Sequence, residues 1–109
     1  MQRFYRSMAI TALVLAGGPG SALAEDAAIT HGKALVEANC SRCHAVGRED
    51  HSKHPEAPAF RTLWQRYPID ALEEAFAEGI YVGHPDMPEF IADPDQIEAI
   101  IAYIDALHE

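Results

Sequence analysis

The pentapeptide Cys40-Ser41-Arg42-Cys43-His44 holds the residues of this chain whose types and spacing best fit a chemical role. The pattern C-x-x-C-H is the attachment signal for a c-type haem. Two cysteines three positions apart on a helical turn can bind the two vinyl groups along one porphyrin edge through their sulfurs. The next residue, His44, then lies below the ring and can offer its imidazole to the iron. We therefore predict one iron-containing haem c, attached covalently to Cys40 and Cys43, with His44 as the proximal ligand.

Three other kinds of site also use a C-x-x-C pattern: redox dithiols, structural disulfides and zinc sites. A thioredoxin-like dithiol should lie in a βαβ pattern, and the sequence has none. A zinc site needs about four ligands, and the chain has no further cysteine. His51, His54 and His84 would have to complete it, whereas His51 and His54 are more typical of solvated loop residues. These sites remain the alternatives to haem.

Met87 is the only methionine beyond the first eight residues, and it lies between Pro85 and Pro88, which prevent a regular helix. A methionine most often fills a gap in a hydrophobic core, and this is the alternative interpretation. A single methionine in a proline-flanked loop, 43 residues beyond His44, fits better as the distal iron ligand. The predicted metal ligands are therefore His44 and Met87.

The first 24 residues resemble a secretory signal. Two arginines precede the short apolar segment 8–16, and Ala22-Leu23-Ala24 offers an A-x-A cleavage site. The apolar run is too short for a transmembrane helix, which needs about 20 residues. We predict a signal peptide at residues 1–24, a single domain at residues 25–109 and a periplasmic location. An uncleaved membrane anchor is the alternative.

The charge of the chain limits the classes of partner. The formal net charge is −9, and loss of residues 1–24 changes it to −11, because two arginines are removed and all 17 acidic residues remain. A small acidic domain is a poor ligand for nucleic acid or anionic lipid, and we expect no stable membrane insertion. Its field would favour a redox partner protein with a basic docking surface. Acidity that only maintains solubility is the alternative.

Helical signals follow one another along the rest of the chain, without the alternation typical of strands. Asp26 can cap a helix that ends near Asn39, and Asp70 resembles the start of a capping box for a helix through Glu78, with Gly79 just beyond its end. Asp93 precedes a proline and a glutamine in a strong helix start, and this last helix extends to about residue 107. The fold class is therefore all-α.

Two residues, one in the first predicted helix and one in a short helix not yet described, suggest specific packing contacts. Gly32 costs roughly 1 kcal/mol in a helix interior, which suggests that another helix approaches closely at this position. A short helix over residues 59–67 places Phe60, Leu63, Trp64 and Tyr67 on one stripe. We expect Trp64, the only tryptophan, to pack against the haem edge, with an ordinary core position as the alternative.

Together these residues resemble a class I cytochrome c of the small bacterial type over nearly the whole predicted domain. The resemblance rests on C-x-x-C-H after an N-terminal helix, a proline-containing loop, Met87-Pro88 and the last helix. It implies crossed first and last helices, with short helices and loops around one haem, and Gly32 meeting Tyr103 at the crossing. It also implies that the carbonyl of Pro58, or secondly that of Pro55, accepts a hydrogen bond from the proximal histidine.

The expected function is soluble periplasmic electron transfer with His/Met ligation, without enzymatic activity. The sequence differs from the mitochondrial-type members of this family, which use several lysines around the haem edge for docking. The predicted domain has only two lysines, Lys33 and Lys53. Partner rules based on a ring of lysines therefore do not carry over. The alternatives are a haem-bearing subunit of a larger periplasmic dehydrogenase or oxidase and, further off, a peroxidase-like or gas-binding protein using His84.

Overall fold

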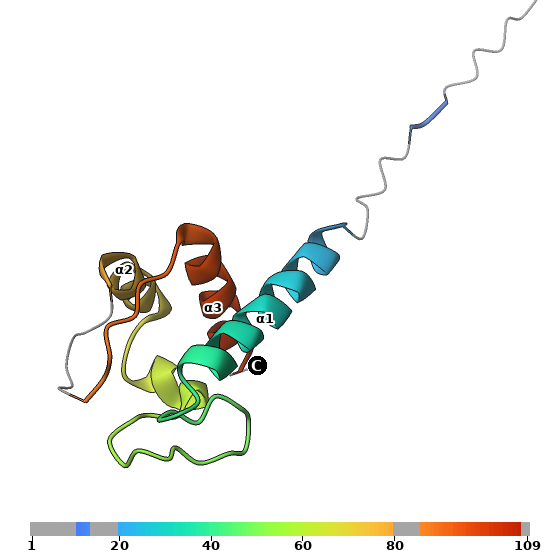
Figure 1. The fold of residues 1–109 in the computed structure, drawn as a ribbon. Helices are drawn as coiled ribbons and strands as arrows, with labels where there is room; N and C mark the ends of the chain where they lie inside the picture. The colour runs from blue at the N-terminus through green and yellow to red at the C-terminus, as the bar shows by residue number, and fades with distance from the viewer. Residues whose placement is uncertain (1–10, 14–19, 80–85, 108–109) are drawn as a thin grey trace, which may run out of the picture.

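The structure is a computed structural model that describes residues 11–13, 20–79 and 86–107. Within these ranges the chain forms four helices and no strand: α1 (Gly20–Asn39), the 3-10 helix η1 (Phe60–Gln65), α2 (Ile69–Glu78) and α3 (Pro94–Ala106). Figure 1 shows α1 and α3 crossing, with α2 on the far side of α3 and the loop after α1 below them. The predicted all-α class is confirmed. None of the helices in the described ranges is long and apolar enough to cross a membrane.

The crossing of α1 and α3 is the main packing contact of the fold, and Gly32 makes it possible. A Cβ atom added to Gly32 would lie 1.9 Å from the carbonyl oxygen of Ala99 and 2.9 Å from Cβ of Tyr103. Only glycine allows the two backbones to come this close, so the predicted meeting of Gly32 and Tyr103 is confirmed. The largest fully buried side chains lie on these same two helices: Val36, Ile100 and Ile104.

The start of α3 and the end of α2 follow their sequence signals. The Asp93 carboxylate accepts a hydrogen bond from the Gln96 backbone at 2.9 Å, and the Gln96 side chain accepts one from the Asp93 backbone at 3.0 Å. This reciprocal pair satisfies two backbone donors that a helix otherwise leaves without partners. Gly79 ends α2 with a φ of +88°, which a residue with a side chain rarely adopts.

Two predicted helix starts are wrong. α1 begins at Gly20, so Asp26 lies inside the helix, because Ala, Leu and Glu at positions 22–25 are all strong helix formers. α2 begins one residue before Asp70, and no side chain caps it. Pro68 provides the extended entry instead, and the Asp70 carboxylate then lies in the first turn, where the helix dipole favours negative charge.

The predicted stripe of helix 59–67 is changed by the type of helix that forms. Residues four positions apart, such as Phe60 and Trp64, differ in direction about the helix axis by roughly 120° in a 3-10 helix, which has about three residues per turn. In an α-helix the same two positions differ by only about 40°. Phe60 and Leu63 are therefore buried together, whereas Trp64 is turned outward and is 51% exposed. Tyr67, beyond the end of η1, is 48% exposed.

Side chains from distant elements fix the loop that follows the cysteine motif. Arg48 donates hydrogen bonds to the carbonyl oxygens of residues 106 and 107 at the end of α3, and Arg61 donates to the Asp50 carbonyl at 2.7 Å. The Tyr103 hydroxyl donates to the Val46 carbonyl. The loop is irregular, as predicted, but it is held against α3 and η1.

Replacing Tyr103 with phenylalanine is expected to lower the free energy of unfolding by about 1 kcal/mol at neutral pH, because the buried Val46 carbonyl loses its donor. Burial, aided by the Glu37 carboxylate, raises the pKa of Tyr103 above its ordinary value of 10.0. The unfolded phenol therefore ionises first, and the wild type loses stability as the pH rises above 10.

Urea unfolding at neutral and alkaline pH tests this prediction. The difference in free energy of unfolding between the wild type and Tyr103→Phe should shrink at alkaline pH. Tyr67→Phe, at a half-exposed tyrosine, should match the wild type at neutral pH, and an equal loss there would contradict this account.

Candidate functional site

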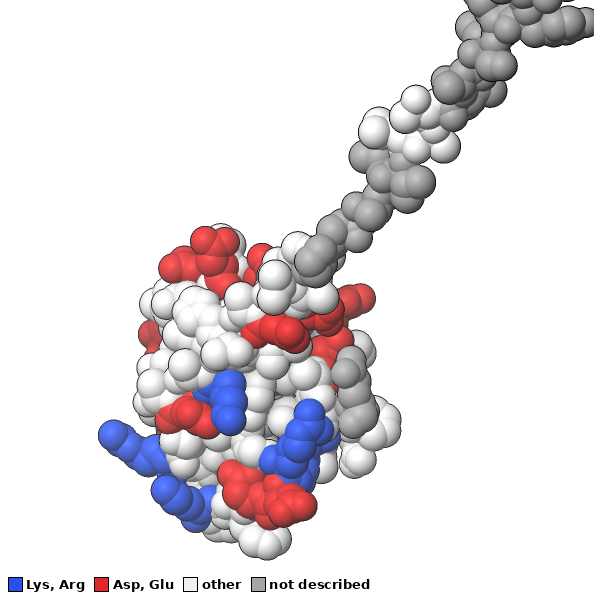
Figure 2. Space-filling view, turned by 90° about the vertical axis from the view of Figure 1, so that its right-hand side faces the viewer, with Lys and Arg blue, Asp and Glu red and all other residues white. Residues whose placement is uncertain are grey.

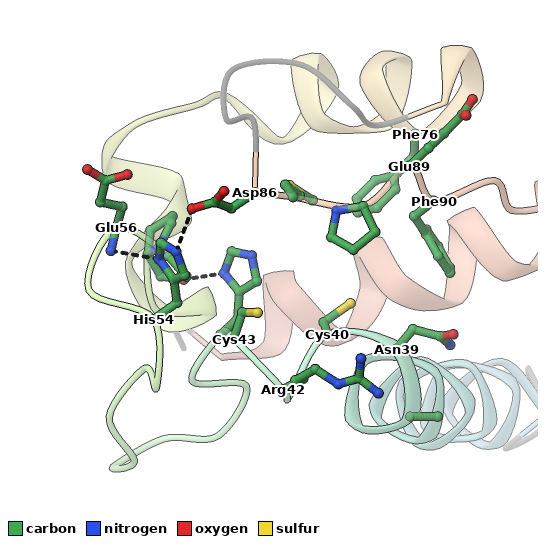
Figure 3. A pocket seen from close by; sticks show the side chains of 16 residues that line it. Asn39, Cys40, Arg42, Cys43, His54, Glu56, Phe76, Asp86, Glu89 and Phe90 are labelled. Atoms are coloured by element: carbon green, nitrogen blue, oxygen red, sulfur yellow. Dashed lines mark hydrogen bonds and ion pairs between the residues drawn. The ribbon is translucent and has the colours of Figure 1, made fainter.

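The cysteine motif lies on a turn that continues α1 beyond its last residue. The Cys40 backbone N–H donates to the Val36 carbonyl at 2.8 Å, and those of Cys43 and His44 donate to the Cys40 carbonyl at 3.2 and 2.9 Å. These bonds keep the five residues in a helical turn. Because residues three apart then share a face, both sulfurs point the same way, as Figure 3 shows for Cys40 and Cys43.

The imidazole of His44 is held by two contacts. Its Nδ1 lies 2.7 Å from the Pro58 carbonyl oxygen, and its ring packs against Phe60 with the ring centres 5.0 Å apart. A carbonyl oxygen can only accept, so Nδ1 carries the proton and donates it. This bond leaves Nε2 without a proton and able to bind a metal. It is the contact that the resemblance implied for Pro58.

Two adjoining cavities surround these residues, with volumes of about 390 and 590 Å³. Both values lie in the roughly 300–1,000 Å³ range of ligand and cofactor pockets. His44 and Met87 line both of them, and the two cysteines line the smaller one. The other residues common to both are Glu56, Pro58 and Phe76.

The segment that carries Met87 lies across the smaller cavity from the cysteine turn. Figure 3 shows its neighbours Asp86 and Phe90 on one side of the opening and Cys40 and Cys43 on the other. Met87 itself is partly exposed. The structure thus brings Cys40, Cys43, His44, Pro58 and Met87 around one apolar space, which fits a haem in the chemistry of its donors.

One residue named from the sequence lies elsewhere. Trp64 lines neither cavity, because the 3-10 geometry turns it outward, and Tyr67 reaches the larger cavity in its place. His84 lies outside the described residues.

The alternatives to haem find no support in the described part of the chain. Cys40 and Cys43 are not joined by a disulfide. Burial raises the pKa of the Cys40 thiol to about 11, whereas the nucleophilic cysteine of a redox dithiol has a lowered pKa. No group of three or more His, Cys, Asp or Glu side chains that could hold a metal ion occurs among the described residues.

His54 is a residue of this site that the sequence did not reveal. It was predicted as a solvated loop residue, but its Nε2 lies 3.2 Å from the Asp86 carboxylate and it lines the smaller cavity. Phe76 and Phe90 also line that cavity and pack edge to face, with ring centres 6.3 Å apart. No signal in the sequence connects His54 with a residue 32 positions away.

The cytochrome c family model matches residues 29–108, which is more than half of the chain. The comparisons with curated proteins and with solved structures give no match. Proteins of the matched family carry an iron-containing haem c bound covalently, and their general role is electron transfer. The matched range contains the cysteine turn, the histidine that is hydrogen-bonded to Pro58 and the residues that line the cavities around them. This chain therefore belongs to the cytochrome c family of haem c electron-transfer proteins.

Proposed function

We propose that this protein is a periplasmic electron carrier in which His44 and Met87 are the axial ligands of one haem iron. The observation that carries this proposal is that both side chains line the same two cavities, beside the cysteines of the attachment motif. Haem supplies a one-electron Fe(III)/Fe(II) couple, whose potential depends on its ligands and on its burial. The family match begins at residue 29, beyond the predicted signal at residues 1–24.

The surrounding residues have distinct tasks in this proposal. The Pro58 carbonyl makes the His44 imidazole more electron-rich and fixes its orientation, which supports the ferric state. The Met87 thioether favours the ferrous state and raises the potential. Buried Phe60 and Phe76 shield the space from water. Ligands that stay in place as the charge of the iron changes would keep rearrangement small, and a one-electron transfer by itself would need no proton donor.

An absorption spectrum of the oxidised protein at neutral pH tests this ligand pair. Sulfur bound to ferric low-spin haem iron gives a weak band near the red end of the visible spectrum. We expect this band in protein made together with haem-attachment machinery. A spectrum without it would contradict Met87 ligation and would favour a histidine ligand or an open position.

The acidity of the chain is concentrated in its C-terminal part. Beyond Arg66 there is no further lysine or arginine, whereas eleven of the 17 acidic residues lie there. On the face seen in Figure 2, the Lys and Arg side chains lie toward the lower part, beside acidic ones, whereas the charged side chains visible in the upper part are acidic. This distribution supports the proposal of a redox partner with a basic docking surface.

Small redox reagents of opposite charge can test the sign of this field. The reduced protein is expected to give its electron to the cationic oxidant tris(phenanthroline)cobalt(III) at a rate that falls severalfold as the ionic strength rises from about 0.01 to 0.1 M. The rate with anionic ferricyanide should rise over the same range. Stopped-flow absorbance measures both rates, and an identical salt dependence would argue against a field-guided encounter.

A further inference from the structure

The segment that carries Met87 is attached to the rest of the described chain at both of its ends. On one side of Met87, the Asp86 carboxylate lies 3.2 Å from Nε2 of His54. On the other side, the Phe90 ring packs edge to face against Phe76 on α2. Because Met87 lies between these two contacts, they limit where its thioether can be. The first contact crosses from the distal segment to the loop on the proximal side.

His54 is a firm support because its own position is fixed by three hydrogen bonds. Its backbone N–H donates to the Cys43 carbonyl at 3.1 Å, and its carbonyl accepts from Ala57 at 3.1 Å. Its ring Nδ1 lies 3.1 Å from the Glu56 backbone nitrogen. His54 therefore connects directly to a residue of the haem-attachment motif.

These contacts also determine the tautomer of His54. A backbone N–H can only donate, so Nδ1 must be the accepting, unprotonated nitrogen. Nε2 then carries the proton and donates it to the Asp86 carboxylate. Figure 3 shows the bonds from Glu56 to His54 and from His54 to Asp86 as two successive links at the edge of the cavity.

We propose that the His54–Asp86 hydrogen bond is a clamp that holds Met87 in position opposite His44. The proposal rests on the His44/Met87 ligation proposed above. The connection runs from the Cys43 carbonyl through His54 to Asp86 and so to Met87, and it joins parts of the chain 32 residues apart. His54 and Asp86 are positioning residues, because they act on the iron only through Met87.

The clamp should affect how easily another ligand displaces Met87. If the bond is lost, the segment can move away from the cavity at a lower cost, and an added imidazole competes more successfully for its place. The His54 side chain is 28% exposed and that of Asp86 67% exposed, so water partly replaces the bond. We therefore expect an affinity for imidazole about fivefold above that of the wild type, within the effect of one ordinary hydrogen bond.

Imidazole titration of the oxidised holoprotein, followed by absorbance, tests the proposal with two independent single variants. In His54→Asn, the shorter side chain can still accept from the Glu56 N–H but cannot reach Asp86. Asp86→Ala removes the other partner. His51→Asn is the matched control, because it makes the same change at an exposed residue of the same loop. We expect both test variants to bind imidazole about fivefold more tightly and the control to match the wild type.

The double variant His54→Asn/Asp86→Ala separates a shared contact from two unrelated effects. Because both changes break one bond, the double variant should bind imidazole no more tightly than either single variant. Effects that multiply would overturn the clamp. The clamp would also be overturned if the wild type showed the red absorption band and both single variants bound imidazole with the wild-type affinity. A wild type without that band would instead overturn the ligation on which the clamp rests.

Discussion

Replacing Met87 with alanine is expected to abolish the red absorption band of the oxidised protein and to lower its reduction potential by on the order of 0.1–0.3 V, within the roughly 0.8 V range that axial ligands govern. The thioether stabilises ferrous iron, and the methyl group of alanine cannot bind a metal. Because Met87 is the only methionine in the predicted domain, no other thioether can replace it. Redox titration followed by absorbance measures both changes.

Ile91→Ala provides the control for this experiment. Ile91 follows closely along the same segment and is 76% exposed, so its loss should leave the band and the potential unchanged. If Met87→Ala kept the band, Met87 would not be the ligand that produces it. If both variants lost the band, its loss would not be specific to the Met87 thioether.

Replacing Gly32 with alanine is expected to prevent stable folding, or to lower the free energy of unfolding by about 3 kcal/mol or more, the upper range for overpacking. The added methyl group would lie 1.9 Å from the Ala99 carbonyl oxygen, which is backbone and cannot rotate away. α1 and α3 would have to separate, and the largest fully buried side chains, Val36, Ile100 and Ile104, lie on these two helices. Small domains have only about 5–15 kcal/mol of stability, so the change is a large share of the total.

His31→Ala is the matched control for Gly32→Ala. His31 is the preceding residue of the same helix and is exposed, so alanine there adds nothing to the crossing. Thermal unfolding of the two holoproteins, followed by circular dichroism, should separate them by many degrees. Equal unfolding temperatures would contradict the close approach of α1 and α3.

The parts of the fold that could be predicted depend on residues close together in sequence. The capping box of α3 needs only Asp93, Pro94 and Gln96, and the C-x-x-C-H motif needs five consecutive residues. The predicted start at Asp26 was wrong because the preceding residues have enough helix propensity of their own to extend α1. Propensity and capping compete at helix ends, and the sequence does not show which prevails.

Trp64 and His54 show where prediction of the site ends. The position of Trp64 depends on whether residues 60–65 form an α-helix or a 3-10 helix, and hydrophobic spacing does not distinguish the two well over six residues. The role of His54 depends on a contact with Asp86 that only the folded chain creates. The role of Pro58 was predictable only through the family resemblance. Its contact with His44 uses the backbone carbonyl oxygen, which every residue has, so the residue type gives no signal of its own.

Mass spectrometry of the exported protein tests the central claim most directly. The account predicts that the peptide containing residues 40–44 carries the added mass of one haem, joined through both cysteines. The same peptide with two free thiols, or with a disulfide between them, would contradict covalent attachment and the site built upon it.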